Sequence, residues 1–129
     1  MRTNADLGLL ILRVSIAGMM FMAHGWGKLT EFTIRAPYFP DPIGLGGTVS
    51  LALAVFAEFF CALAVVLGVG TRLATIPLMA TMAIAAFVVH ADDPWGKKEF
   101  ALLYLIPFVT LFFTGGGRYS VDRMLLNRR

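Results

Sequence analysis

Residues 7–29 read LGLLILRVSIAGMMFMAHGWGKL, and this stretch decides the fold class. A helix needs about 20 apolar residues to cross a bilayer core, within a range of roughly 17–25. The run is long enough, although it contains Arg13 and ends in His24 and Lys28. A cleaved signal peptide does not fit, because the charged start is short, Arg13 interrupts the apolar region and no small-residue cleavage site follows. The stretch therefore predicts a first transmembrane helix that stays in the mature protein.

The composition of the whole chain agrees with a membrane protein. Apolar residues make up 58% of the 129 residues and charged residues 15%, against about 45–50% and 25% in soluble domains. The formal charge is +3, but the basic residues are scattered between apolar runs and gathered at the C-terminus. A nucleic-acid partner would require a basic patch or stripe, so none is predicted. The single cysteine, Cys61, excludes an internal disulfide and a cysteine-based zinc site.

Three more charge-poor runs follow the first. The expected spans are about 7–29, 48–69, 73–91 and 99–115. Alanines are frequent in the second and third spans, and small residues let membrane helices approach closely. We expect an all-α protein whose residues 1–129 form a single transmembrane domain, an integral membrane four-helix bundle. The tail SVDRMLLNRR predicts a short C-terminal amphipathic helix capped by Ser120.

The loops between the spans predict how the chain lies in the membrane. The first connection, TEFTIRAPYFPDPIGLGG, cannot cross hydrocarbon as irregular backbone and is expected to fold across one mouth of the bundle. Lysine and arginine near span ends set orientation. The side that holds both termini carries more of them, namely Arg2, Arg72, Arg118, Arg123, Arg128 and Arg129. We therefore expect a multi-pass protein of the cytoplasmic membrane with both termini in the cytoplasm.

Ionisable residues within spans are costly and usually face the bundle interior. At about 100° per residue, each span that carries them has one polar stripe. The stripes are Arg13, Met20, His24 and Lys28; Arg72, Met79 and His90; and Glu99, Ile106 and Thr110. With a rise of about 1.5 Å per residue, His24, His90 and Glu99 lie roughly 24–26 Å from the inner span ends. Glu58 lies deeper, within reach of Arg13.

Two interpretations of these groups stay open. In the first, Arg13 and Glu58 form a buried pair that fixes helix register. In the second, the groups surround an outward-facing pocket, because histidine titrates near neutral pH and quinol oxidation releases protons beside an apolar ring. The candidate catalytic residues are then His24, Glu58, His90 and Glu99, and the candidate ligand-binding residues are Arg13, Lys28 and Tyr104.

Two further features bear on the ligand. Phe100, Tyr104, Phe108 and Phe112 recur every fourth residue and could stack a quinone ring or simply pack helices. Two histidines and two glutamates could ligate iron, manganese or zinc. Bundles that bind two metals use Glu-x-x-His motifs, which the chain lacks, so no metal site is predicted.

An ordered set of motifs resembles the DoxX family. They are Arg13 and then HGWGKL in the first span, Glu58 in the second, GVGTR at the tight turn, His90 ending the third span, EFALLYL opening the fourth, and GGGRYSVD after it. The resemblance implies a small four-helix protein of the prokaryotic cytoplasmic membrane, and its motif residues here include Arg72 and Arg118. It also implies a link to quinol oxidases, thiosulfate–quinone chemistry and membrane oxidoreductase complexes.

Our leading hypothesis is a redox-associated subunit that binds a quinone, a quinol or a similar small aromatic in the outer half of the bundle. The chain has no haem-ligation pattern, flavin motif or redox cysteine pair, so it would be at most a subunit of a membrane oxidoreductase. The lipid bilayer is the expected partner, and partner oxidoreductase subunits or a homo-oligomer stay open. A small-solute transporter and a non-catalytic assembly subunit are the alternatives. A quinone site predicts an apolar cleft that opens sideways to lipid beside His24 or His90. A transporter predicts a polar path that continues inward past Glu58 and Arg13 towards Arg72, and a scaffold predicts a filled core with tightly paired charges.

Overall fold

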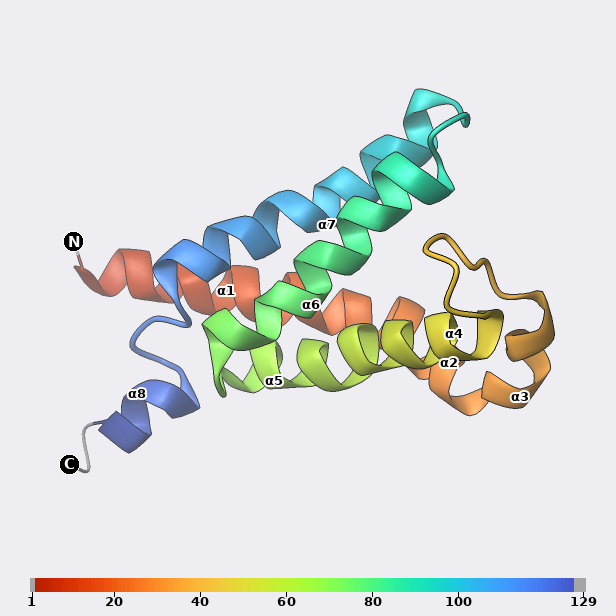
Figure 1. Ribbon diagram of the computed structural model, residues 1–129. Coiled ribbons are helices and arrows are strands. Elements are labelled where there is room, and N and C mark those ends of the chain that lie inside the picture. The colour runs from red at the N-terminus through yellow and green to blue at the C-terminus, as the bar shows by residue number, and fades with distance from the viewer. Residues whose placement is uncertain (1, 127–129) are drawn as a thin grey trace.

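The computed structural model describes residues 2–126, and every regular element in that range is a helix (Figure 1). This confirms the all-α class for the described part of the chain. Arg128, Arg129 and the side chain of Arg2, which entered the orientation argument, lie outside what the structure describes.

The elements follow the predicted spans. The first rod joins α1 (Arg2–Met20), the π-helical turn η1 (Phe21–Gly25) and α2 (Trp26–Thr30). The short α3 (Phe32–Arg35) and the 3₁₀ turn η2 (Ala36–Tyr38) open the first connection. The second rod joins α4 (Gly47–Val55), the π-helical η3 (Phe56–Cys61) and α5 (Ala62–Leu67). The third rod joins α6 (Thr71–Ile84) and the π-helical η4 (Ala85–Val89), and α7 (Trp95–Thr114) and α8 (Val121–Leu126) complete the chain.

Three helices are long and apolar enough to cross a membrane: Asn4–Thr30, Gly47–Leu67 and Thr71–Val89. They match the first three predicted spans. The fourth predicted span is occupied by α7, which is 20 residues long. Its first turns carry Lys97, Lys98 and Glu99, so its apolar part is shorter, and its crossing of the membrane stays a prediction.

The helices pack so that both termini lie at the same end of the molecule (Figure 1). α6 and α7 lie side by side along their length, and α5 packs beside α1. Towards the far end, the α6–α7 pair diverges from α4 (Figure 1). The core between the packed helices includes the fully buried residues Ala17, Met20, Leu78, Phe108 and Leu111.

The turn GVGTR and the segment GGGRYSVD form one junction at the end that holds the termini. The Asp122 carboxylate accepts hydrogen bonds from the backbone N–H groups of Gly70 (2.7 Å) and Thr71 (3.1 Å), which caps the start of α6. Gly68 has φ +76°, and a Cβ there would overlap the side chain of Ser120. Ser120 caps α8 through the N–H of Arg123 at 3.3 Å, as predicted. The two motifs therefore hold the C-terminal segment against the α5–α6 turn.

Arg13 belongs to this junction and not to the predicted pair with Glu58, so that pairing is wrong. Its guanidinium donates hydrogen bonds to the carbonyl oxygens of Val66 (3.3 Å), Gly116 and Tyr119 (2.9 Å). Arg13 is only 2% exposed. Val66 lies in the last turn of α5, where carbonyls lack helical partners and the helix dipole favours a cation. The side chain therefore reaches towards the termini, away from Glu58.

Candidate functional site

A cavity of about 380 Å³ lies at the end of the bundle away from the termini, where α6 diverges from α4. Ligand pockets usually enclose about 300–1,000 Å³ and combine an apolar lining with a few polar groups. Leu53, Ala54, Met82 and Ile84 are among the apolar lining residues. The polar lining residues are His24, Lys28, Ser50, Glu58, Thr81, His90, Lys97 and Tyr104. The cavity thus has the size and composition of a small-molecule site.

All three membrane-capable helices become π-helical at the level of the cavity. The turn η1 contains His24, η3 contains Glu58, and η4 ends immediately before His90. Single π-helical turns are rare in proteins and are found frequently at functional sites. Each wider turn changes the angular position of the side chains that follow it. Each turn contains or directly precedes one ionisable residue that lines the cavity, namely His24, Glu58 or His90.

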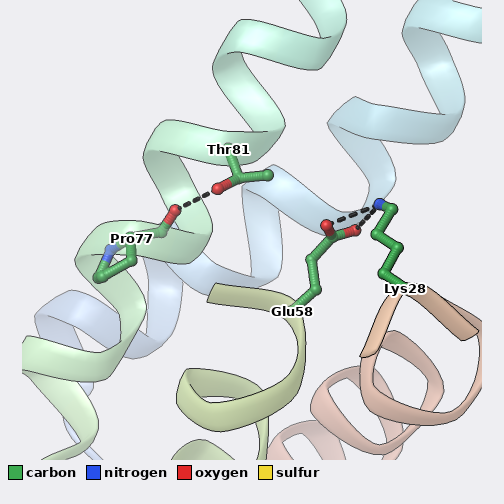
Figure 2. Close-up of polar contacts among 4 residues, drawn as sticks. All are labelled: Lys28, Glu58, Pro77 and Thr81. Carbon is green, nitrogen blue, oxygen red and sulfur yellow. Dashed lines mark hydrogen bonds and ion pairs between the residues drawn. The ribbon is translucent and has the colours of Figure 1, made fainter. Parts of the chain in front are cut away.

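Glu58 is paired with Lys28. Both carboxylate oxygens lie 2.7 Å from Lys28 Nζ, and the two side chains point towards each other across the interface of the first and second rods (Figure 2). The Glu58 side chain is 2% exposed and that of Lys28 is 18% exposed. An ammonium beside a buried carboxylate offsets the cost of removing that charge from water. The cavity wall therefore contains an ion pair rather than a free carboxylate.

Gly25 allows the two rods to approach this closely. A Cβ at Gly25 would overlap the backbone carbonyl of Glu58, which leaves no space for any side chain. The glycine after His24 is therefore required by the contact that places Lys28 beside Glu58. Sequence reasoning did not assign this role, although the glycines of HGWGKL were its visible signal.

The two histidines have different surroundings. The centre of the His24 ring lies 5.6 Å from the centre of the Tyr104 ring, which it meets edge to face, and 5.6 Å from the centre of the Phe100 ring. The Nδ1 atom of His90 lies 2.7 Å from Oδ2 of Asp93. This hydrogen bond is the main cause that lowers the pKa of Asp93 below its ordinary value. His24 is thus held among aromatic rings, whereas His90 is held by a carboxylate.

The first connection covers the cavity, as expected, through Phe39, Pro40, Pro42 and Ile43. The Asp41 carboxylate holds this loop to the start of α4. It accepts hydrogen bonds from the N–H groups of Leu45 (2.8 Å) and Gly46 (2.9 Å) and from the Ser50 hydroxyl (2.9 Å). The Gly46 hydrogen bond is the main cause that lowers the pKa of Asp41.

A second contact joins this loop to the ion pair. Lys28 Nζ lies 5.8 Å from the centre of the Phe39 ring, within the range of a cation–π contact. The lid of the cavity therefore rests directly on its charged wall.

Of the seven predicted site residues, the structure brings His24, Lys28, Glu58, His90 and Tyr104 to the cavity. Arg13 lies at the opposite end of the bundle, and Glu99 is exposed and does not line the cavity.

The predicted orientation of the fourth helix is wrong, because Glu99, Ile106 and Thr110 all face outward. Its inner face instead presents Lys97, Ala101, Tyr104 and Phe108. Of the aromatic row, Phe100 and Tyr104 line the cavity, whereas Phe108 packs in the core and stacks on Tyr104.

Sequence reasoning missed the lining residues Lys97, Ser50 and Thr81. It also missed Asp41, whose carboxylate holds the first connection, and Asp93, whose carboxylate holds His90. Thr81 donates a hydrogen bond to the carbonyl of Pro77 at 2.8 Å (Figure 2). Pro77 lies inside α6. Short hydroxyl and loop residues of this kind have no distinct sequence signal.

The arrangement can hold a ring and exchange protons with its substituents. Within residues 2–126, no three His, Cys, Asp or Glu side chains are grouped so that they could hold a metal ion together. An apolar cavity with two imidazoles and an ion pair suits an aromatic molecule that carries hydroxyl or carbonyl oxygens.

Comparison with known proteins places the chain in a family. The DoxX family model matches residues 8–91. Inner membrane protein YqjF of Escherichia coli is 29% identical over 129 residues, covering 97% of each chain. An uncharacterized protein of Haemophilus influenzae is 31% identical over 127 residues, covering 93% of this chain and 92% of its own. No solved structure matches the chain significantly. The pattern of apolar helices and the family match together identify this chain as a membrane protein of the DoxX family.

Proposed function

We propose that this protein binds a quinone, a quinol or a similar small aromatic in the cavity and acts as a redox-associated membrane subunit. The observation that carries the proposal is the convergence of His24, His90, Tyr104 and the Lys28–Glu58 pair on one largely apolar cavity. An aromatic ring gains from leaving water for such a lining, and its oxygens can bond the polar groups. The sequence has no haem-ligation pattern, flavin motif or redox cysteine pair, so we expect a partner subunit to move the electrons.

The core below the cavity favours binding over transport. A transporter would need a polar path from Glu58 past Arg13 towards Arg72. Instead, Ala17, Met20, Leu78 and Leu111 are fully buried and apolar in this region, and Arg13 is bonded to three backbone carbonyls. A pure scaffold would be expected to fill the space at the cavity end, where about 380 Å³ stays open.

Equilibrium binding tests the proposal. The purified protein in detergent is titrated with a short-chain benzoquinone and with its quinol by calorimetry. His24→Gln and the double variant Lys28→Met, Glu58→Gln should each abolish binding, because they remove the polar anchors and leave no unpaired charge. Phe113→Leu, at an exposed position outside the cavity, should bind as the wild type does. Equal binding by all variants with unchanged thermal unfolding would reject this site.

We also propose that α7 crosses the membrane and that both termini lie in the cytoplasm. Both termini lie at one end of the molecule (Figure 1), and the sequence assigns the larger share of the lysine and arginine residues near span ends to that side. Cys61 is the only cysteine, so Cys61→Ala gives a cysteine-free background. In that background, Lys98→Cys should react with an impermeant maleimide in intact cells, and Arg118→Cys only after lysis. The reverse pattern would invert the topology, and equal accessibility of both would contradict a crossing by α7.

A further inference from the structure

We propose that His90 and Asp93 form a proton-accepting dyad, in which His90 takes the proton of a ligand hydroxyl and Asp93 is its positioning residue. The inference rests on the proposed function, because it names the ionisable group that the ligand must carry. The ligand is then a phenol or a quinol, whose hydroxyl group binds in the cavity and ionises there.

The backbone after η4 builds the dyad. His90 leaves helical geometry (φ −103°, ψ 22°), and the N–H of Asp93 donates a hydrogen bond to the His90 carbonyl at 3.1 Å. This closed turn brings Asp93 back beside the imidazole, where Oδ2 lies 2.7 Å from Nδ1. The His90 side chain is 31% exposed and lines the cavity, whereas the Asp93 side chain is 36% exposed and is not part of the lining. His90 therefore belongs to the cavity lining, whereas its carboxylate partner does not.

The hydrogen bond fixes which nitrogen can act. An ionised carboxylate only accepts hydrogen bonds, so Nδ1 carries the hydrogen and Nε2 of the neutral ring keeps its lone pair. Within residues 2–126, Nε2 has no hydrogen-bond partner. A base must lie within hydrogen-bond reach of the proton that it takes. Nε2 is therefore the atom that a hydroxyl in the cavity would meet.

The proposed step is a proton transfer alone. The ligand O–H bond breaks, an Nε2–H bond forms, and no electron changes hands. The ligand becomes an anion, and the imidazolium is stabilised by the Asp93 carboxylate. Lys28 and Lys97 line the same cavity and would stabilise the anion. The charged or titratable groups around His90 are Asp92 and Asp93 of its own turn, Lys97, Lys98 and Tyr104 of α7, His24 and Lys28 of the first rod, and Glu58 of the second.

Within residues 2–126, no hydrogen bond joins His24 to a carboxylate. The aromatic rings beside His24 are those of Phe100 and Tyr104, and Glu58 is bonded through both oxygens to Lys28. The two histidines therefore differ in role: His24 orients the ligand ring and His90 receives its proton.

The test uses a chromophoric phenol whose anion absorbs at longer wavelength than the neutral form. Its ionisation is followed from pH 5 to 9 in the wild-type protein, in Asp93→Asn and in Asp92→Asn, the matched control one residue away. We expect the wild type to bring the ionisation midpoint of the bound phenol about one unit below that of the free phenol, a tenfold change. Asp93→Asn should lose this shift, Asp92→Asn should keep it, and Asp93→Glu should restore part of it.

The outcomes separate the dyad from the proposed function. If Asp93→Asn and Asp92→Asn bind the phenol with the same ionisation midpoint, the dyad is overturned while the cavity stands. If the folded wild type binds no phenol, both proposals fail. Nitrogen NMR of the His90 ring gives a readout that needs no ligand: wild type should carry its hydrogen on Nδ1, and a ring with hydrogen on Nε2 contradicts the dyad.

Discussion

At the scale of single residues, we expect substitution of one partner in the Lys28–Glu58 ion pair to lower the stability most. Removing one partner of a buried pair leaves an uncompensated charge, which typically costs about 3–5 kcal/mol. Because Lys28 is partly exposed, we expect Glu58→Gln to cost an amount at the low end of this range, about 3 kcal/mol of unfolding free energy. Thermal unfolding in detergent should show a lower midpoint for Glu58→Gln and recovery in the double variant Lys28→Met, Glu58→Gln. A double variant as unstable as the single one would show that the loss does not come from an uncompensated charge on Lys28.

Gly25 provides a second prediction at this scale. Its Cβ-free face lies against the backbone of Glu58, whereas a methyl group added at Gly18 on the same rod would have nothing within 4 Å. Gly25→Ala should therefore force the first and second rods apart and lower the unfolding midpoint. Gly18→Ala should be neutral or stabilising, because alanine favours a helix by about 1 kcal/mol over glycine. Equal unfolding midpoints for the two variants would contradict the close contact.

At the scale of elements, the loop that covers the cavity depends on one carboxylate. Hydrogen bonds, above all that from Gly46, hold the pKa of Asp41 below its ordinary value of 3.8. A carboxyl whose pKa is lowered by folding contributes stability above the unfolded value and loses it as the pH falls through the folded value. The Leu45 and Gly46 amides should thus be protected from hydrogen exchange at pH 5 and lose protection only below about pH 4. Asp41→Asn should show weaker protection that no longer depends on pH in this range, and an unchanged pH profile in that variant would contradict the role of Asp41.

The same scale explains how much could be predicted from sequence. Hydropathy predicted the helices, and helical periodicity correctly put Met20, His24 and Lys28 on one inner stripe. Periodicity failed on the fourth helix, because one group, Glu99, was used to choose its inner face, although Ala101, Tyr104 and Phe108 mark the buried side. The π-helical turns were not predicted, because helical periodicity assumes a regular α-helix throughout each span. The Arg13 contacts were missed because their acceptors are backbone carbonyls, which any residue provides.

At the scale of the whole molecule, the two ends of the bundle have separate roles. Arg13, Asp122 and Ser120 join the chain ends to the α5–α6 turn, and the cavity lies at the opposite end. Between the two ends lies a close-packed apolar core in which Phe108 and Leu111 are fully buried. A charged or polar solute would have to cross this core without hydrogen-bond partners, which costs several kcal/mol for each unsatisfied group. The fold is therefore suited to a site that is reached from one end only.

This closed core predicts the behaviour of the protein in vesicles. Proteoliposomes that contain the wild type should equilibrate protons and small organic acids no faster than empty vesicles, with or without a quinol in the cavity. A trapped pH-sensitive dye measures the proton flux. His24→Gln should give the same trace, because the barrier lies in the core and not at the cavity. Flux in the wild type that His24→Gln abolishes would instead favour the transporter, since the cavity would then be the entrance of a path that opens through the core.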